Sequence, residues 1–356
     1  MMTNKLSGEE LSERVKSGDF FYQEDFSGVD CKCLDLSGGI FSEVCFDNCS
    51  FTGANLKETL FNECSMKKVR FSDTFLHQTN FINCNLEKSD FESVTGESIR
   101  FLSCEMKSAN FTSTVFKPMC VFTDTALNGA SFSGSNLEAV VFTSCGLEEV
   151  DFSNAFIDKT TFFKCGFEQN TFKNAAINLT LFHGAKLTGT DFSHMDLNQC
   201  QFHESLLKEC DFSRSKLRQG GFMWAELAKA RFDDADLELA NFYEANLSDS
   251  SFQKAHLKMA GMQKSVVKNG DFSSANLYQA QLEGVNAENS IFKNSDLTYA
   301  DLSHAQLFNS DFSNANLFMA NLHEVKDKDT NWKGSKKSIS RGTDPVRQKS
   351  EQWGRQ

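Results

Sequence analysis

The sequence contains few of the residues that usually make tight turns, with only 2 prolines and 21 glycines among 356 residues. It also has no apolar run that approaches about 18 residues, so we expect no membrane-spanning segment. The first residues lack the apolar core of a signal peptide, and we therefore expect a cytoplasmic chain. If the chain turns often, ordinary residues must adopt one recurrent turn geometry.

Signatures of catalysis are missing as well. The sequence has no glycine-rich phosphate loop, no G-x-S-x-G, no H-E-x-x-H and no closely paired cysteines of a zinc site. We therefore expect no enzyme, no catalytic residues, no cofactor and no metal site.

What the sequence does contain is a repeat. A phenylalanine occupies every twentieth position from Phe132 to Phe312, and within this spacing a Phe or Leu recurs about every fifth residue. A small residue usually lies two positions before each of these large residues. A period of five suits neither a helix nor a flat strand, but it suits a chain that turns a corner every five residues and points two of the five inward. Because large residues keep their identity at a spacing of twenty, we predict four sides in each turn.

The repeats resemble those of the pentapeptide-repeat family, whose pattern is a small residue, Asp or Asn, Leu or Phe, and two freer positions. Ala-Asn-Leu at 245–247, 275–277 and 315–317 and Ala-Asp-Leu at 235–237 and 300–302 match this pattern. The resemblance covers roughly residues 24–325 and implies an all-β fold, a right-handed quadrilateral parallel β-helix. It also implies a bacterial protein. Because catalytic motifs are missing, we predict a non-enzymatic protein that binds or scaffolds other proteins.

Nine of the 12 cysteines occupy the small core positions of the repeat. We interpret them as reduced thiols that pack as small apolar side chains in a cytosolic protein. Cys64, Cys84 and Cys104 are expected to stack in a line, which does not suit tetrahedral zinc.

The pattern divides the chain into three segments. Residues 1–23 form an N-terminal cap in which Ser7 and Glu10 have the spacing of a capping box, so a short helix is expected over residues 8–16. The solenoid follows over residues 24–325, with a one-residue register slip near 116–122 at Pro118, and Gly96 is expected to mark a collapsed or bulged side. Residues 326–356 are basic and lose the period, which indicates a flexible tail.

Partner recognition must lie on the outward positions of each repeat. One outward column contains aromatic residues, histidine and methionine and predicts a partner-binding stripe of Phe163, His183, His203, Met223, Trp224 and Tyr243. A second apolar group lies toward the C-terminal end and predicts pairing of two chains there, through Leu239, Met259, Tyr278, Tyr299, Phe318 and Met319.

Two alternative functions stay open at this point. The net charge of −12 and the acidic row of Asp151, Asp191, Asp211, Asp271 and Asp311 suggest a DNA mimic, although the charge is sparser than that of duplex DNA. Residues 22–26 also resemble the opening of the family's gyrase-protecting quinolone-resistance proteins, whereas direct binding of nucleic acid is not expected. Residues 6–11 and 18–19 resemble the lead-in of type VI secretion accessory proteins, which would make the chain a secretion component or a delivered effector.

Overall fold

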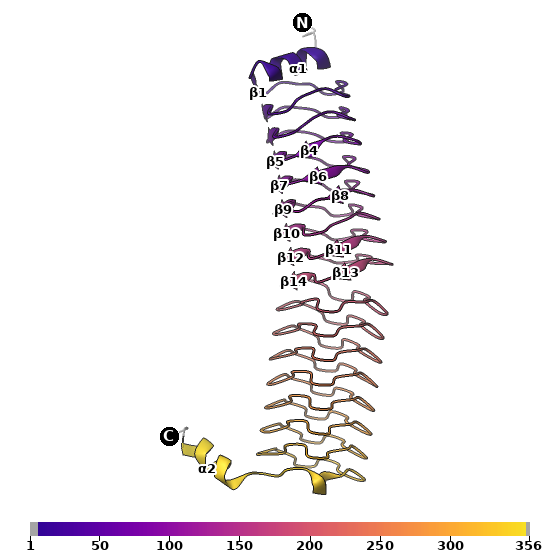
Figure 1. Ribbon diagram of the computed structural model, residues 1–356, viewed down its shortest axis with the longest axis vertical. Coiled ribbons are helices and arrows are strands. Elements are labelled where there is room, and N and C mark those ends of the chain that lie inside the picture. Colours follow the sequence, from indigo (N-terminus) through magenta and orange to yellow (C-terminus); the bar gives the residue numbers. More distant parts are fainter. Residues whose placement is uncertain (1–5, 354–356) are drawn as a thin grey trace. The chain divides into compact units, whose positions relative to one another are not determined.

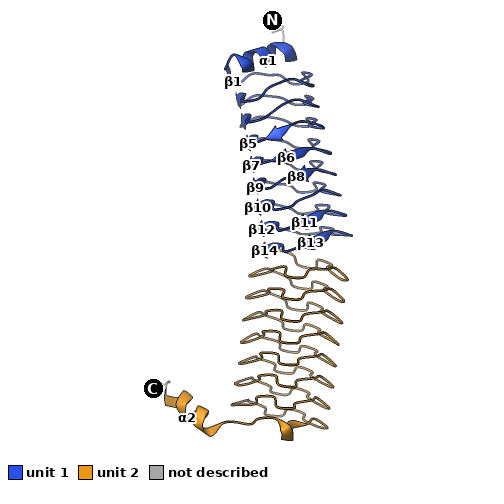
Figure 2. Ribbon diagram, viewed as in Figure 1, with its two compact units in different colours: residues 1–181 blue, residues 182–356 orange. Residues whose placement is uncertain are grey.

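The computed structural model describes residues 6–353 and divides into two compact units, unit 1 up to Leu181 and unit 2 from Phe182 (Figure 2). Each unit is a stack of four-sided turns whose neighbouring turns pair in parallel (Figure 1). The predicted fold class, a quadrilateral parallel β-solenoid with a short N-terminal helix, is confirmed. Neither helix in residues 6–353 is long and apolar enough to cross a membrane.

The strands are short because the chain turns a corner every five residues, which leaves two or three residues for each side. Most strands of unit 1 follow one another along one side of the stack, and the remainder lie on another side. Their bounds are β1 (Phe20–Tyr22), β2 (Ile40–Ser42), β3 (Leu60–Asn62), β4 (Leu76–His77), β5 (Asn80–Ile82), β6 (Thr95–Glu97), β7 (Arg100–Leu102), β8 (Val115–Phe116), β9 (Val121–Thr123), β10 (Val141–Thr143), β11 (Phe156–Asp158), β12 (Thr161–Phe163) and β13 (Ala176–Asn178). Strand β14 (Leu181–His183) begins at the last residue of unit 1 and ends in unit 2.

Strand partners lie twenty residues apart, as the repeat predicts. Phe142 pairs with Phe162 in unit 1. Among the described residues of unit 2 after β14, neighbouring turns pair through isolated parallel bridges at the same spacing. Asp211 bridges Arg231, and Arg231 bridges Ser251.

The large core residues stack in columns inside each unit. The rings of Phe152 and Phe172 lie 5.2 Å apart with an interplanar angle of 4°. In unit 2 the ring centroids of Phe252 and Phe272 are 4.7 Å apart, and those of Phe272 and Phe292 are 4.8 Å apart. Because nearly every such ring is fully buried, each contributes about 1.5–3 kcal/mol through loss of apolar surface from water.

The small core residues satisfy backbone groups that the turns bury. Ser215 Oγ donates to the carbonyl of Phe212 at 2.7 Å, and Thr79 Oγ1 donates to the carbonyl of Leu56 at 2.8 Å. The buried thiol of Cys84 similarly lies 3.4 Å from the carbonyl of Phe61. A small side chain with a short donor therefore fits inside the corner without leaving an unpaired polar group.

One turn geometry recurs through both units. The residue two positions after each large core residue usually has a positive φ, for example 58° at Trp224, and the next residue donates its N–H back to the large residue's carbonyl, as Ala225 does to Phe222 at 3.2 Å. Ordinary residues adopt this left-handed conformation repeatedly, which explains how so many turns form with so few glycines and prolines.

The N-terminal helix α1 (Gly8–Lys16) forms as predicted, with Ser7 and Glu10 making both hydrogen bonds of the capping box. It buries Leu11 and Val15 against the first turns, where Ser12 Oγ donates to the carbonyl of Asp35 at 2.8 Å. The helix thus covers the open end of unit 1, which a solenoid otherwise exposes.

The register slip at Pro118 is present. Phe101 pairs with Phe122 rather than with residue 121, so the segment between β8 and β9 accommodates one extra residue. The bulge expected at Gly96 is wrong, because β6 stays in register between β4 and β8. The Ile99 side chain fills the space that a large residue would take, so that a Cβ on Gly96 would overlap Ile99 Cδ1.

The segment predicted to be a flexible tail contains regular structure in its described residues, 326–353. Asp311 still bridges Asn331, and the Trp332 ring stacks 4.7 Å from that of Phe312, which closes the last core column. A 3-10 helix, η1 (Lys337–Ile339), and helix α2 (Pro345–Trp353) follow. The period weakens here because Asp327 and Lys337 stand five residues before and after Trp332, where the repeat would have Phe or Leu. The flexibility of this segment stays a prediction.

Candidate interaction surfaces

Unit 2 has one edge of apolar side chains at the positive-φ positions of successive turns, which we call the apolar edge. Backbone hydrogen bonds join these turns in order, such as Leu239 N–H to the carbonyl of Lys258 and Met259 N–H to that of Tyr278. The column comprises Gln199, Gln219, Leu239, Met259, Gln279, Tyr299 and Met319. Ile339 of the 3-10 helix η1 follows it, since Met319 N–H donates to the carbonyl of Ile339.

The apolar edge is exposed. Leu239 is 41% exposed, Met259 44% and Tyr299 42%. Neighbouring aromatic rings extend it, since Tyr299 packs edge-on against Tyr278 at 5.9 Å and against Phe318 at 5.7 Å. Five of the six residues predicted for oligomerisation are thus exposed, Tyr278 is half-buried, and Ile339 is a further exposed apolar residue. That these residues pair two chains stays a prediction.

The choice of residues on this edge is unfavourable for the turn itself. Leu239, Met259, Tyr299 and Met319 have φ between 56° and 62°, a region that glycine and asparagine adopt at the least cost. The other three columns of positive-φ residues in unit 2 contain glycine, asparagine and other polar or charged residues, with Trp224 as the exception among the described positions. Bulky apolar residues on this edge contribute neither to the turn nor to the core.

The predicted stripe lies mostly in unit 2, where His183, His203, Met223 and Tyr243 occupy one outward position in successive turns and are half-buried. Trp224 is next to Met223 and is 46% exposed. Phe163 belongs to unit 1, where Lys164 Nζ lies 5.1 Å from its ring centroid. That Phe163 continues the stripe stays a prediction.

The aromatic end of the stripe is held by polar contacts. Trp224 Nε1 donates to Glu244 Oε2 at 3.1 Å, and its ring meets that of Tyr243 edge-on at 6.2 Å. Lys264 Nζ donates to the Tyr243 hydroxyl at 3.0 Å and lies 3.5 Å from Glu244. Hydrogen bonds from Tyr243 and Trp224 lower the pKa of Glu244, so this corner presents two oriented aromatic rings beside a fixed carboxylate.

The histidine end of the stripe is less exposed. The pKa of His203 is lowered by burial and by the neighbouring His183, because both disfavour a positive charge on the His203 ring. Its Nδ1 is buried and has no hydrogen-bond partner among the described residues. His183 Nε2 lies 3.7 Å from Glu204 Oε2.

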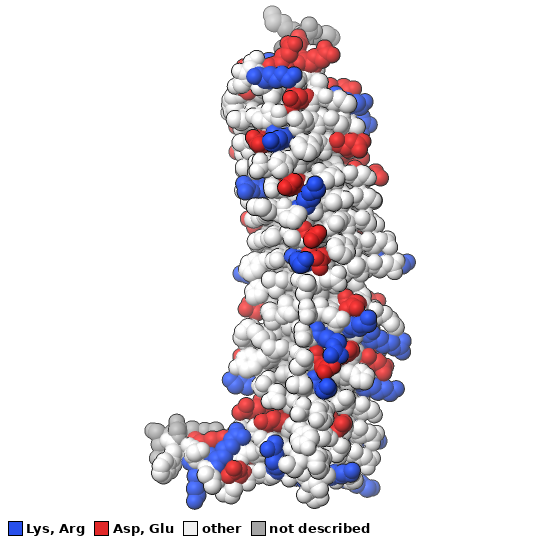
Figure 3. Space-filling view, viewed as in Figure 1, with Lys and Arg blue, Asp and Glu red and all other residues white. Residues whose placement is uncertain are grey.

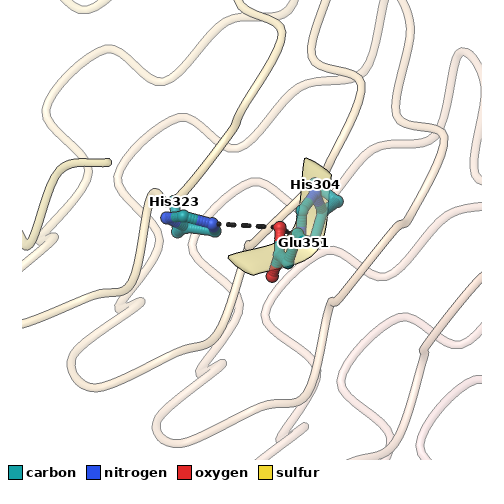
Figure 4. Close-up of side chains that lie close together, drawn as sticks. All are labelled: His304, His323 and Glu351. Atoms are coloured by element: carbon teal, nitrogen blue, oxygen red, sulfur yellow. Dashed lines mark hydrogen bonds and ion pairs between the residues drawn. The ribbon is translucent and has the colours of Figure 1, made fainter. Parts of the chain in front are cut away.

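A third cluster, which sequence reasoning missed, joins α2 to the last turns of unit 2. Figure 4 shows His304 and His323 on successive turns, with Glu351 of α2 between them. Their Nε2 atoms lie 3.2 Å and 3.3 Å from Glu351 Oε2, and Arg347 Nε donates to Oε1 at 2.7 Å. Glu351 lies outside the repeat, so the period gives no signal for this contact.

The acidic row has a structural role. Asp151, Asp211 and Asp271 each accept a hydrogen bond at 2.8 Å from the N–H two residues later, so their carboxylates stabilise the turns. Arg231 also pairs with Asp211 at 3.3 Å. Over the face drawn in Figure 3, Lys and Arg lie among Asp and Glu rather than apart from them.

Comparisons with known proteins agree with this architecture. The model of the pentapeptide repeat region matches residues 44–116, and that of pentapeptide repeats, in 8 copies, matches residues 120–156, 179–219, 222–258 and 275–314. A search of curated proteins gave no match.

Among solved structures, trypsin-treated QnrB1, a plasmid-mediated fluoroquinolone resistance protein, is 24% identical over 51% of this chain and 87% of its own, with a TM-score of 0.36. HetL, a pentapeptide repeat protein involved in heterocyst differentiation regulation in the cyanobacterium Nostoc, is 16% identical over 86% of this chain and 96% of its own, with a TM-score of 0.21. With a repeat that matches along most of its length and turns that stack at a spacing of twenty, the chain belongs to the pentapeptide-repeat family.

Proposed function

We propose that this chain is a non-catalytic, cytoplasmic protein of bacterial type that binds other proteins and holds them on a solenoid support. The observation that carries the proposal is the apolar edge, because it places exposed apolar side chains where the fold itself favours Gly or Asn. Exposed apolar surface of this kind is typical of protein contacts.

For the apolar edge we propose a second copy of the chain as the partner. The chain carries a net charge of −12, so two copies repel each other over most of their surfaces. The positive-φ column from Gln199 to Met319 contains no charged residue, and two such rows can pack against each other about a two-fold axis. The homodimer at the C-terminal end thus has a specific surface.

Sedimentation velocity over a range of concentrations tests the dimer. Glutamine is the natural residue at three positions of this column, so it replaces the apolar residues without disturbing the turn, as in Leu239→Gln, Met259→Gln, Tyr299→Gln and Met319→Gln. The matched control makes the same change in polar columns: Asn269→Gln, Asn289→Gln, Asn309→Gln and Asn314→Gln. We expect a dimer in the wild type and the control and a monomer in the edge variant. A monomeric wild type, or a dimer in the edge variant, contradicts the proposal.

For the stripe we propose a different protein as partner, with Trp224 and Tyr243 as the anchoring residues. Large aromatic residues at exposed positions commonly dominate binding energy. A photo-crosslinking amino acid at position 224, compared with one at position 269, tests this in cells. We expect one discrete adduct from position 224 that disappears when Tyr243→Ala is added. Equal adducts from both positions would remove the stripe from the proposal.

A DNA-mimicking role toward gyrase has less support, because the acidic row serves the turns and lies beside basic residues. A supercoiling assay with and without a quinolone decides this, since inhibition or protection at micromolar protein would favour the mimic. A secretion role is tested separately by comparing the culture supernatants of strains with and without a functional type VI apparatus.

A further inference from the structure

Helix α2 contacts the last turns on one side of unit 2. Tyr243 and Gln263 are half-buried and Glu283 is exposed, whereas Ser303 and His323, at the same position of the last turns, are buried. This position is the one that carries His183, His203, Met223 and Tyr243. In unit 2 of Figure 1, α2 lies beside the last turns. The helix therefore lies at the C-terminal end of the side of unit 2 that carries the stripe.

The helix is attached through polar contacts alone among its described residues. It buries no side chain of its own, and Val346 and Trp353 are 78% and 84% exposed. Contact with the turns comes from Glu351 and from Gln348, whose Nε2 donates to Glu324 Oε1 at 2.6 Å. A helix held in this way lacks the apolar packing that normally fixes helices in place.

Glu351 is the centre of the attachment. It accepts hydrogen bonds from Arg347 within α2 and from both histidines of the turns. The other charged groups near it are Asp344 at the start of α2 and Glu283, Asp301 and Glu324 on the turns. Without the Glu351 carboxylate the two histidines would lose their acceptor, while Arg347 would keep only its longer-range attraction to Asp301 and Glu283.

A second contact of His323 indicates whether protons or a metal ion join His304, His323 and Glu351. The backbone N–H of Asp344 donates to His323 Nδ1 at 3.0 Å. A neutral imidazole that accepts at Nδ1 carries its proton on Nε2, which is the atom that faces Glu351. A metal ion at Nε2 would move that proton to Nδ1, where it would oppose the Asp344 N–H. The contacts thus favour protons over a metal ion.

We propose that α2 is a releasable strap, held by a hydrogen-bonded clasp of Glu351 with His304 and His323 and not by a metal ion. Release would uncover Ser303 and His323 and extend the open side toward the C-terminal end. The strap rests on the proposed function, because α2 determines how far the exposed side that carries the stripe extends toward the C-terminal end. It is tested without any partner, so its failure is separate from the failure of that proposal.

Hydrogen–deuterium exchange of the full chain tests the strap. Glu351→Gln keeps the size of the side chain and removes its charge, and Glu288→Gln is the matched control because Glu288 pairs with Lys268 at 2.8 Å elsewhere in unit 2. We expect the amides of 345–353 to exchange about tenfold faster in the Glu351 variant, as for loss of charge-assisted hydrogen bonds, and to be unchanged in the control. The amides of 345–353 should exchange more slowly in the His304→Gln variant, which retains an N–H donor, than in the His304→Leu variant.

Each result decides the inference. Unchanged exchange in the Glu351 variant would overturn the clasp. If the α2 amides of the wild type exchange faster after EDTA, or more slowly with one bound Zn²⁺ per chain, the clasp is contradicted and a metal ion holds the three side chains. Exchange that is insensitive to EDTA and ZnCl₂ but sensitive to Glu351→Gln supports the strap.

Discussion

Truncation of a single ring in the core columns provides a direct measure of how the solenoid is stabilised. Phe232 is fully buried in unit 2. Its ring stacks 5.0 Å from Phe212 and 4.7 Å from Phe252, and it meets Phe222 and Phe242 edge-on, each at 5.7 Å. The change Phe232→Ala removes the ring and leaves a cavity between two turns, while Phe232→Leu keeps most of the volume and removes only the aromatic contacts.

The two variants should differ clearly. Phe232→Ala should lower the free energy of unfolding by about 3–5 kcal/mol, the usual cost of a Phe cavity. Phe232→Leu should cost less, about 1–2 kcal/mol, because each aromatic pair is worth roughly 0.5–1.5 kcal/mol beyond its buried area and leucine recovers part of the packing. Met262→Leu, in another fully buried position of unit 2, is the control and should cost less than about 1.5 kcal/mol.

Hydrogen exchange of residues 220–255 is the appropriate assay, because a long repeat array need not unfold in one step. The peptides of the turns above and below Phe232 should lose protection together in the alanine variant, and distant turns should change little. Equal protection in the alanine and leucine variants would refute the idea that ring volume in the columns sets local stability.

Further predictions concern single positions. Gly96→Ala should destabilise unit 1 by about 1–3 kcal/mol in thermal unfolding, because the new methyl group would overlap Ile99. Ser7→Ala should cost about 1 kcal/mol, measured as faster exchange of the α1 amides, because it removes the capping box. Leu239→Asn should raise stability by up to about 1 kcal/mol in denaturant unfolding, since Asn tolerates positive φ better than Leu, while it weakens self-association. Burial opposes ionisation of Glu351, but hydrogen bonds from Arg347, His323 and His304 outweigh it and lower its pKa from 4.5 to about 2. The contribution of the Glu351 carboxylate to α2 docking is therefore complete above pH 4.5 and is lost as the pH falls toward 2. The α2 amides should exchange faster over that pH range.

Much of this architecture follows from the sequence alone. The period of five and the spacing of twenty predicted four sides, the core columns and the register slip at Pro118, because each turn repeats one local conformation and contacts only its neighbours. Ser7 and Glu10 predicted α1 for the same reason, since a capping box is a local interaction. A single five-residue pattern predicts little, but its repetition along the chain predicts the fold clearly.

Other features depend on contacts that the period does not contain. Gly96 looked like a defect, yet Ile99, three residues away, fills its space. The apolar residues near the C-terminal end were visible in the sequence, but only the folded turns place them in one exposed column while the three other columns stay mainly polar. The contact of Glu351 with His304 and His323 was not predictable, because it joins a helix outside the repeat to two turns through side chains that no spacing relates. Local turn chemistry and the size of inward residues thus determine the solenoid from the sequence, whereas the exposed surfaces and the attachment of α2 are decided by which side chains the tertiary structure brings together.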